Sequence, residues 1–268
     1  MLWIIQKNMY QENRRGDLIL SLERLQIPYI ITDIHHYEID AIIKDEKQPI
    51  IVNGSIRLAK IAQKRNWNPG SFLNENFSYD VWFHHYNNFL LNKDAIFCTI
   101  ADAKIHQEEF FIRPILDDKS FDGKVFQKKE FLKFQQNCLQ GLPGMPKPET
   151  KILICKTQKK IGQEHRHYIV DGKIITSSRY KLSGQPNFQE GADDYILDFV
   201  QNIINKWQPA KAFVLDTFIS SENIGIIEVG GICYAGLYQA NIMKLVYALD
   251  NISLEPISNT KLEIQNKY

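Results

Sequence analysis

The sequence predicts an α/β protein whose C-terminal half is of the α+β type. In the first 70 residues, short apolar runs alternate with helical patterns, which is typical of parallel strands joined by crossover helices. Beyond residue 149, apolar runs follow one another with turn residues between them, which is typical of antiparallel hairpins covered by helices. A chain of 268 residues is long enough for one large domain or two small ones.

The N-terminal unit is predicted to be a small parallel sheet. Leu2–Gln6 is a short apolar run that fits a buried strand. Leu18, Leu22 and Leu25 then recur at helical spacing. The remaining elements predicted here are two strands and a helix, over 29–31, 49–52 and 56–62. An aromatic-rich stretch follows over 71–92, and we expect it to pack in a core or between domains.

The rest of the chain is predicted to be mostly strand. The predicted strands are 109–114, 124–126, 152–155, 166–170, 173–176, 213–219 and 226–229, and the predicted helices are 131–139, 193–207 and 239–249. Asp171-Gly172 is a strong two-residue hairpin signal between two of these strands. Three prolines and two glycines between residues 141 and 148 form the strongest linker signal in the chain.

Composition narrows the class of protein. Hydrophobic residues make up 44% and charged residues 24%, so the chain can bury a core and is not largely disordered. Lysine and arginine total 32 against 31 acidic residues, a balance that weighs against dedicated nucleic-acid binding. No apolar run approaches the roughly 20 residues that span a bilayer. The four cysteines form no CxxC motif, so we expect buried free thiols, a cytoplasmic protein and no membrane partner.

A loop between two predicted strands carries groups that suit phosphate binding. Lys119, Ser120 and Gly123 lie in this loop, and Arg113 lies just before it. Backbone N–H groups and a lysine in a flexible loop can close over phosphates, and arginine supplies a permanently charged fork. The alternative is a solvated hairpin tip with a lysine.

Two acids interrupt the strands of the late hairpin. If its loop is centred near Glu222, Asp216 and Glu228 stand opposite each other on one sheet face. Two like charges side by side favour a cation between them, and oxygen ligands suit Mg²⁺. The alternative is that each acid pairs with a lysine such as Lys211.

A third group of polar residues lies in the predicted strand before the Asp171-Gly172 turn. Glu164 and Arg166 are two residues apart, so they share a face of that strand. This face would look toward a bound ligand if the sheet lines a cleft, or the two residues would form a surface ion pair.

These constellations, in this order, resemble the ATP-grasp superfamily, and more narrowly the ATP-grasp clade that is named for two arginines and a lysine. The likeness covers about residues 93–250. Arg113, Lys119 and Arg166 are the best matches to the naming residues, with Arg179 as a rival for the second arginine. The stretches that carry the likeness are Phe111-Ile112-Arg113-Pro114, Lys119-Ser120-Phe121-Asp122-Gly123, Glu164-His165-Arg166, Ser177-Ser178-Arg179-Tyr180, Asp216, Glu228-Val229 and Gly236-Leu237-Tyr238.

The resemblance implies an ATP-grasp fold with a small pre-ATP-grasp domain over 1–92 and an ATP-grasp domain over 93–268. The latter would have subdomains over about 93–145 and 149–268, with ATP between them. The implied nucleotide-binding residues are Arg113, Lys119, Ser120, Ile154, Cys155, Lys156 and Glu164, the metal ligands are Asp216 and Glu228, and the catalytic arginines are Arg166 and Arg179.

The implied activity is transfer of the γ-phosphoryl group of ATP to a carboxylate, followed by attack of an amine on the acylphosphate. The partners would be Mg²⁺, ATP, a carboxylate-bearing amino acid, peptide or protein, and an amine acceptor. One departure is Gly230, because the family usually has asparagine two residues after the metal-binding glutamate. The other interpretations are a kinase on the same fold, a nucleotide-binding module that no longer catalyses, and an interaction protein built on residues 71–92.

Overall fold

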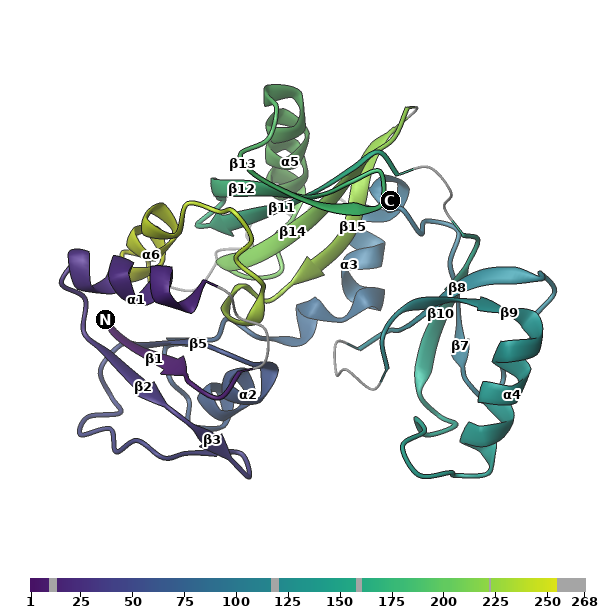
Figure 1. The fold of residues 1–268 in the computed structure, drawn as a ribbon, viewed down its shortest axis with the longest axis horizontal. Coiled ribbons are helices and arrows are strands. Elements are labelled where there is room, and N and C mark those ends of the chain that lie inside the picture. The colour runs from purple at the N-terminus through teal and green to yellow at the C-terminus, as the bar shows by residue number, and fades with distance from the viewer. Residues whose placement is uncertain (10–13, 117–120, 158–160, 222, 255–268) are drawn as a thin grey trace, which may run out of the picture.

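The computed structural model describes residues 1–9, 14–116, 121–157, 161–221 and 223–254. Figure 1 shows three parts: an N-terminal α/β unit, a small sheet with one long helix, and a larger sheet between helices. Lys119 and Ser120, on which part of the predicted phosphate loop depends, lie outside the described residues.

The N-terminal unit is built on a parallel sheet, as predicted. The strand order is β2-β1-β5-β6, and each adjacent pair is parallel. All five residues of β1 are buried, which explains why Leu2–Ile5 are all apolar. A short β3–β4 hairpin was not predicted. The elements are β1 Leu2–Gln6, α1 Arg15–Arg24, β2 Tyr29–Thr32, β3 Ile34–His35, β4 Glu38–Ile39, β5 Ile50–Asn53, α2 Ile56–Lys64 and β6 Pro69–Gly70.

The aromatic-rich stretch packs in a core, as predicted, and this core is shared with the larger sheet. It contains two 3₁₀ turns, Glu75–Phe77 and Asn87–Phe89, on either side of α3 Tyr79–Tyr86. The buried rings of α3 belong to one hydrophobic cluster with Phe213 and Leu215 of the larger sheet. This stretch therefore joins the N-terminal unit to the rest of the fold.

The small sheet is antiparallel, with strand order β7-β10-β8-β9. β10 follows the Pro- and Gly-rich stretch over 141–148 but pairs with β7 and β8, which precede it. Strand pairing therefore places the limit of this subdomain after β10 rather than near residue 145. The elements are β7 Ile96–Thr99, β8 Glu109–Pro114, β9 Lys124–Gln127, α4 Lys128–Leu139 and β10 Lys151–Cys155.

The larger sheet is an antiparallel sheet of five strands, in the order β13-β12-β11-β14-β15. Asp171 and Gly172 have φ of 46° and 71°, so the predicted hairpin turn is confirmed. β13 was not predicted. The elements are β11 Gln163–Val170, β12 Lys173–Leu182, β13 Gln185–Glu190, α5 Asp194–Lys206, β14 Ala212–Ile219, β15 Ile224–Gly230, the 3₁₀ turn Ile232–Tyr234 and α6 Ile242–Asp250.

Alternate residues of the central strands are buried on opposite faces of the larger sheet. Tyr168 and Val214 belong to the cluster that includes the N-terminal sheet and α6. Ile169 and Leu215 belong to the cluster that includes α3 and α5. Both faces are therefore covered, and any polar residue buried there must find a partner within the protein.

Two further expectations concern thiols and membranes. All four cysteines are free, and Cys138, Cys155 and Cys233 are buried, while Cys98 is partly exposed. Among the residues that the structure describes, no helix has both the length and the apolar character needed to cross a membrane.

Candidate active site

A buried ion pair lies at the centre of the larger sheet. Arg166 of β11 stands directly opposite Asp216 of β14 in the strand register. Its Nε donates to Asp216 Oδ1 at 2.8 Å and its Nη2 donates to Asp216 Oδ2 at 2.8 Å. The side chain of Asp216 is only 4% exposed and that of Arg166 13%. This two-pronged geometry is the strong form of a charge-assisted hydrogen bond.

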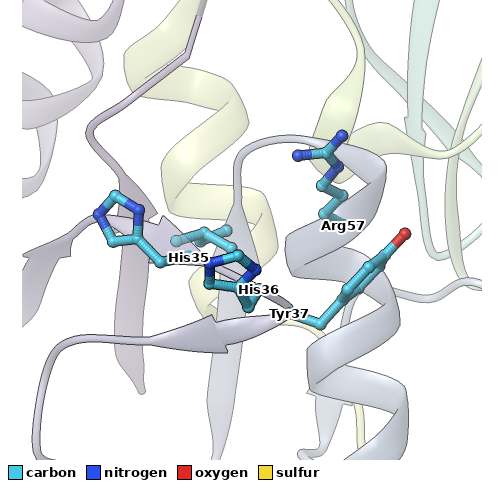
Figure 2. A pocket seen from close by; sticks show the side chains of 5 residues that line it. His35, His36, Tyr37 and Arg57 are labelled. Atoms are coloured by element: carbon cyan, nitrogen blue, oxygen red, sulfur yellow. The ribbon is translucent and has the colours of Figure 1, made fainter.

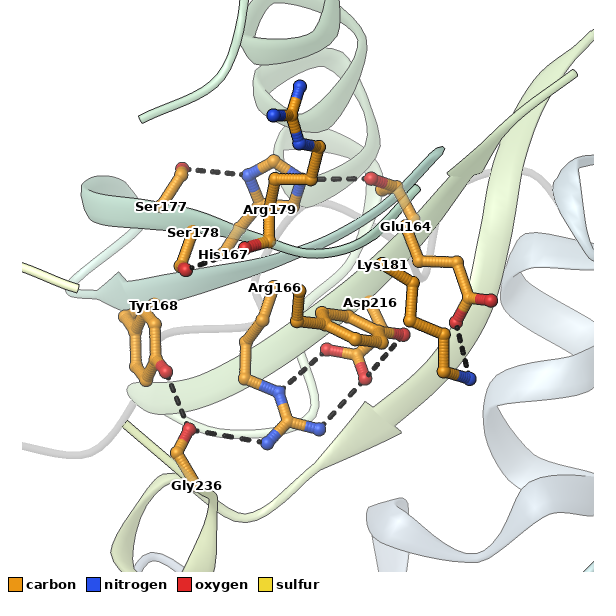
Figure 3. A network of polar contacts seen from close by, with 12 residues as sticks. Glu164, Arg166, His167, Tyr168, Ser177, Ser178, Arg179, Lys181, Asp216 and Gly236 are labelled. Atoms are coloured by element: carbon orange, nitrogen blue, oxygen red, sulfur yellow. Dashed lines mark hydrogen bonds and ion pairs between the residues drawn. The ribbon is translucent and has the colours of Figure 1, made fainter. Parts of the chain in front are cut away.

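Aromatic rings and one backbone oxygen lie beside this ion pair, and Figure 3 shows Tyr168 and Gly236 next to Arg166. The Arg166 guanidinium carbon lies 5.0 Å from the ring centroid of Tyr238 and 6.0 Å from that of Tyr180. The hydroxyl group of Tyr180 lies 3.4 Å from Asp216 Oδ2. Arg166 Nη1 and the Tyr168 hydroxyl both donate to the carbonyl oxygen of Gly236, at 3.4 and 2.6 Å.

Burial and charge act in opposite directions on the two members of this pair. Burial alone would lower the pKa of Arg166, but the charge and hydrogen bonds of Asp216 hold that pKa well above its ordinary value. Burial raises the pKa of the Asp216 carboxyl, and the Arg166 guanidinium works against this rise. Arg166 is therefore a permanent positive charge fixed inside the fold.

A second ion pair connects the larger sheet to the small one. Nη2 of Arg113 on β8 donates to Glu228 Oε1 on β15 at 2.8 Å. The Arg113 guanidinium carbon also lies 5.5 Å from the ring centroid of Tyr79 in α3. Glu228 pairs with Asp216 in the strand register, which confirms the prediction that the two acids stand opposite each other. Each acid pairs with an arginine, whereas Lys211 bonds to Ser253 instead.

A cavity of about 320 Å³ lies between the two sheets, beside the Arg113–Glu228 pair. Side chains of β8, of the segment after β8 and of β15 line it together. Of the described residues that were predicted to bind nucleotide, Arg113 is in the lining, whereas Ile154, Cys155, Lys156 and Glu164 are not. The lining residues are Phe111, Arg113, Pro114, Leu116, Phe121, Asp122, Gly123, Ile227 and Glu228.

Two β-bulges bring additional side chains to this region. In β12, the register shifts between Arg179 and Lys181 relative to β11, so Tyr180 is an extra residue. Lys181 thereby stands opposite Glu164, and its Nζ lies 3.3 Å from Glu164 Oε2. In β15, a shift beside the Asp216–Glu228 pair makes Ile227 the extra residue, and Ile227 lines the cavity.

The predicted site residues fall into two groups. Glu164 and Arg166 share one sheet face, as predicted, and Asp216 lies on that face opposite Arg166 (Figure 3). Arg179 pairs instead with His165, and Figure 3 shows its guanidinium on the other side of the sheet from Arg166. Its guanidinium donates to side-chain oxygens of β13, on Asn187 and Gln189. The structure therefore does not bring the two predicted catalytic arginines together.

The predicted adenine-binding residues lie at the end of β10. Cys155 is buried, Ile154 is partly buried and Lys156 is exposed. The Cys155 thiol lies 3.1 Å from Asn92 Oδ1, and burial raises its pKa to about 12. This thiol is therefore protonated at neutral pH and has little nucleophilic character.

Sequence reasoning assigned no role to the rings around Arg166. Tyr180 and Tyr238 stack with centroids 4.9 Å apart, and Phe188 stacks on Tyr238 at 5.7 Å. Strand alternation was the sequence signal that could have placed Tyr180 near Arg166. Ser178 stands opposite Arg166, and Tyr180 lies two residues further along β12. Tyr238 has a φ of +44°, a left-handed backbone conformation that no local pattern predicts.

A second hollow lies in the N-terminal unit, between the β3–β4 hairpin and α2 (Figure 2). His35, His36 and Tyr37 line it together with Arg57, whose guanidinium carbon is 5.9 Å from the Tyr37 ring centroid. Its side chains come from one unit alone, whereas those around the first cavity come from both sheets.

The acidic residues fit a divalent cation only in part. Glu228 lines the cavity, and its side chain is 32% exposed. Both oxygens of Asp216 already accept from Arg166, and Gly230 offers no side-chain ligand. Among the described residues, no three His, Cys, Asp or Glu side chains gather in a way that could hold a metal ion. Of the two predicted metal ligands, only Glu228 therefore lines the cavity, where its carboxylate is of the oxygen type that Mg²⁺ prefers.

Two antiparallel sheets with a cavity between them, preceded by an α/β unit, form the ATP-grasp fold, and the comparisons with known proteins agree. The matching family model describes the ATP-grasp domain of family 2 in the clade named for two arginines and a lysine, and it covers residues 90–248. This match spans more than half of the chain, and the chain belongs to that family.

Solved structures share the fold across most of their length. A crystal structure of the D-cycloserine synthetase DcsG has a TM-score of 0.62 and 11% identity, over 92% of this chain and 98% of that one. The D-alanine–D-alanine ligase from Coxiella burnetii has a TM-score of 0.60 and 10% identity, over 95% of both chains. The ATP-grasp ligase PsnB, complexed with a minimal precursor, has a TM-score of 0.54 and 9% identity, over 93% and 97%.

At these identities the structural likeness shows the fold alone. A search of curated protein sequences finds no match. The family model and the shared fold together identify an ATP-grasp domain in this chain.

Proposed function

We propose that this protein is an ATP-dependent carboxylate–amine ligase that works through an acylphosphate. The observation that supports this most is the placement of the Arg166–Asp216 and Arg113–Glu228 pairs. They are neighbours on one sheet face, and the second borders the cavity between the two sheets. Positive groups fixed around a transferring phosphoryl group stabilise the charge on its oxygens.

Each residue has a proposed role. ATP would bind in the cavity, with its base near Ile154, Cys155 and Lys156. Arg113, already at the cavity wall, would move its guanidinium from Glu228 to the phosphates. Glu228 would hold Mg²⁺, which neutralises phosphate charge when it is bound.

Further proposed contacts extend this set. Lys119 and Ser120 would contact phosphates from the loop before Gly123, a role that stays a prediction because both lie outside the described residues. Glu164, fixed by Lys181, would face the nucleotide from β11. Arg166 would hold the developing acylphosphate, because its charge is fixed and shielded from water by Tyr238 and Tyr180. Arg179 has no part in this proposal, because its side chain lies on the other face.

The proposed reaction has two steps. A carboxylate oxygen of the first substrate attacks the γ-phosphorus of ATP, the bond to the β-phosphate oxygen breaks, and ADP leaves. The amine nitrogen of the second substrate then attacks the acyl carbon, and the carbon–oxygen bond to phosphate breaks. Inorganic phosphate leaves, and the amine loses one proton to phosphate or water. The carboxylate donor would be an amino acid, a peptide or a protein terminus.

Two measurements test this proposal. The first is thermal unfolding with and without Mg-ATP. A ligand at about 100 times its Kd stabilises by about 2.7 kcal/mol, which for a chain of this size is a rise of about 5–10 °C. The control is Arg65→Gln, which removes a surface arginine that pairs with Glu38 and Glu46. No magnesium-dependent rise with any nucleotide would contradict the proposed site.

The second measurement traps the acylphosphate. Hydroxylamine replaces the unknown amine, and pools of amino acids and peptides supply the carboxylate. We expect ADP formation together with a hydroxamate that mass spectrometry can identify. A stable phosphorylated product without hydroxamate would identify a kinase on this fold instead. Nucleotide binding without any ADP formation across the pools would indicate a module that no longer catalyses.

A further inference from the structure

The carboxylate of Asp216 is already paired with a positive charge of the protein itself, the Arg166 guanidinium. We propose that the Arg166 guanidinium occupies the place of a second divalent cation, so that each chain binds a single Mg²⁺ with its nucleotide, through Glu228. Sites of phosphoryl transfer commonly use two metal ions that bridge and neutralise the phosphates. The inference rests on the proposed function, because it concerns the same nucleotide site.

The geometry of the Arg166–Asp216 pair is the first observation. Each oxygen of Asp216 accepts a hydrogen bond of 2.8 Å from a different nitrogen of Arg166. The Tyr180 hydroxyl, 3.4 Å from Oδ2, is a further neighbour. A metal ion would have to displace a planar group held by two hydrogen bonds and covered by two rings. Breaking such a buried pair is strongly unfavourable, because it leaves the guanidinium without a counter-charge.

The second observation is independent and concerns Gly230. This residue stands opposite Val214 in the register, two residues along from the Glu228–Asp216 pair and on the same face. A Cβ atom at position 230 would lie 3.3 Å from Val214 Cγ2, so a small adjustment of that methyl group accommodates a side chain. The absence of an oxygen ligand here is therefore not forced by the backbone. A second cation would therefore lack a ligand at position 230, and its other ligand, Asp216, is already paired with Arg166.

Glu228 provides the contrast within the same site. Its side chain is 32% exposed and lines the cavity, whereas the Asp216 side chain is 4% exposed and is absent from the cavity lining. An incoming metal–nucleotide complex therefore reaches Glu228 from the cavity, where Oε1 of Glu228 accepts from Arg113 until that guanidinium moves to the phosphates. It reaches Asp216 only if Arg166 leaves, so a single cation is the state that the geometry favours.

The test counts metal ions on the intact protein. Mn²⁺ replaces Mg²⁺, a non-hydrolysable ATP analogue replaces ATP, and electron paramagnetic resonance gives the bound Mn²⁺ per chain. Bound nucleotide is measured in the same samples. We expect one Mn²⁺ per bound nucleotide. Two Mn²⁺ per nucleotide would overturn the inference and leave the proposed function intact, whereas absence of nucleotide binding would overturn both.

Variants test the role of Arg166 itself. In the double variant Arg166→Gln, Gly230→Asn, Asp216 is released and an amide ligand is added. We expect two Mn²⁺ per nucleotide, and a melting temperature that rises with Mn²⁺ more than in the unaltered protein. Gly230→Asn alone should keep one Mn²⁺, because Asp216 is still occupied. Arg65→Gln is the control for loss of an ion-paired arginine outside the proposed site, since Arg65 pairs with Glu38 and Glu46.

The outcomes remain decisive if the double variant folds poorly. Arg166→Lys keeps the positive charge, and we expect it to fold and to bind one Mn²⁺. A folded double variant that still binds one Mn²⁺ would show that Asp216 is not a displaced metal ligand and would overturn the inference. If the double variant does not fold, the count on the unaltered protein and on Gly230→Asn decides, because two Mn²⁺ in either one contradicts the proposal.

Discussion

Arg166 and His167 are neighbours in β11, but their side chains lie on opposite faces of the larger sheet and are accommodated in different ways. Arg166 keeps its charge and is matched by the charge of Asp216. His167 is fully buried between two hydroxyls, Ser177 Oγ at 2.8 Å from Nδ1 and Thr217 Oγ1 at 2.9 Å from Nε2. Burial lowers its pKa to about 3, so it is neutral.

The difference shows what each face can do. A buried group that is neutral and satisfied by neutral partners fixes the packing but offers little field to a ligand. A buried ion pair near a cavity provides a fixed charge that can stabilise charge in a reaction. The face that carries Arg166 also carries the Arg113–Glu228 pair and the cavity, whereas the face that carries His167 is covered by α5.

The largest expected effect comes from breaking the charged pair. Asp216→Leu leaves Arg166 buried without a counter-charge, and we expect a loss of about 3–5 kcal/mol in the free energy of unfolding. Urea denaturation at pH 7 measures it. The control is the double variant Arg166→Met, Asp216→Leu, which replaces both charges by apolar groups and should recover most of the loss. If the double variant is as unstable as the single one, the loss arises from packing rather than from the unpaired charge.

The next largest effect is a loss of stability at acid pH, which comes from the buried histidines on the face of His167. Burial lowers the pKa of His165 to about 4 and that of His167 to about 3, against about 6.5 in an unfolded chain. The unfolded chain therefore binds more protons below pH 6.5, so the contribution of the neutral imidazoles is complete above pH 6.5 and is lost as pH falls. We expect His167 to account for about 3 kcal/mol of lost stability at pH 4.

Urea denaturation between pH 7 and pH 4 checks this acid effect. His167→Gln removes the titrating group and keeps a polar side chain, so its stability should fall less steeply below pH 6.5. The charged groups that act on the adjacent His165 are Arg179 and Asp193, and both are unchanged in this variant. Parallel losses in the variant and the unaltered protein would show that His167 does not titrate in this range.

Much of the charged face could be predicted from sequence because strand alternation has a fixed period. The apolar pattern of the late hairpin sets its register, and this places Asp216 opposite Glu228 on one face. The same rule places Glu164 and Arg166 together. What the pattern could not show is that Arg166 is the partner of Asp216, because the pairing joins positions 50 residues apart on different strands.

The bulge in β12 is a feature that the sequence pattern did not predict. Strict alternation puts Lys181 on the face of Arg179, whereas the extra residue Tyr180 turns Lys181 toward Glu164. A bulge adds no clear local signal to a strand of mixed polar and apolar residues. The family resemblance left Arg166 and Arg179 as rivals, and the strand register, which pairs Arg166 with Ser178 and Arg179 with His165, places them on opposite faces. The Pro- and Gly-rich stretch misplaced the subdomain limit because such residues mark turns, whether or not the chain leaves a sheet.

A smaller effect distinguishes the arginines of the two faces in ligand binding. We expect Arg113→Gln, at the cavity wall, to weaken binding of an ATP analogue about tenfold, which corresponds to about 1.4 kcal/mol. Arg179→Gln should change that affinity less than about twofold, since its guanidinium bonds to side chains of β13 on the other face. Isothermal titration calorimetry measures both affinities. A tenfold loss in Arg179→Gln would show that the face of His167 also contributes to the nucleotide site.

The smallest effect is expected at Gly230, on the same face as Asp216. Its backbone needs no glycine, and a Cβ atom would meet only Val214 Cγ2 at 3.3 Å. We expect Gly230→Ala to change the free energy of unfolding by less than about 1 kcal/mol, because the lower entropy of the unfolded chain offsets a small steric cost. Gly225→Ala is the control in the same strand, since its Cβ atom would lie 2.5 Å from the carbonyl oxygen of Phe89. Denaturation midpoints of the two variants should differ clearly. Equal losses would mean that position 230 is as tightly constrained as position 225. Packing would then explain the glycine, and its presence would say nothing about metal ligands.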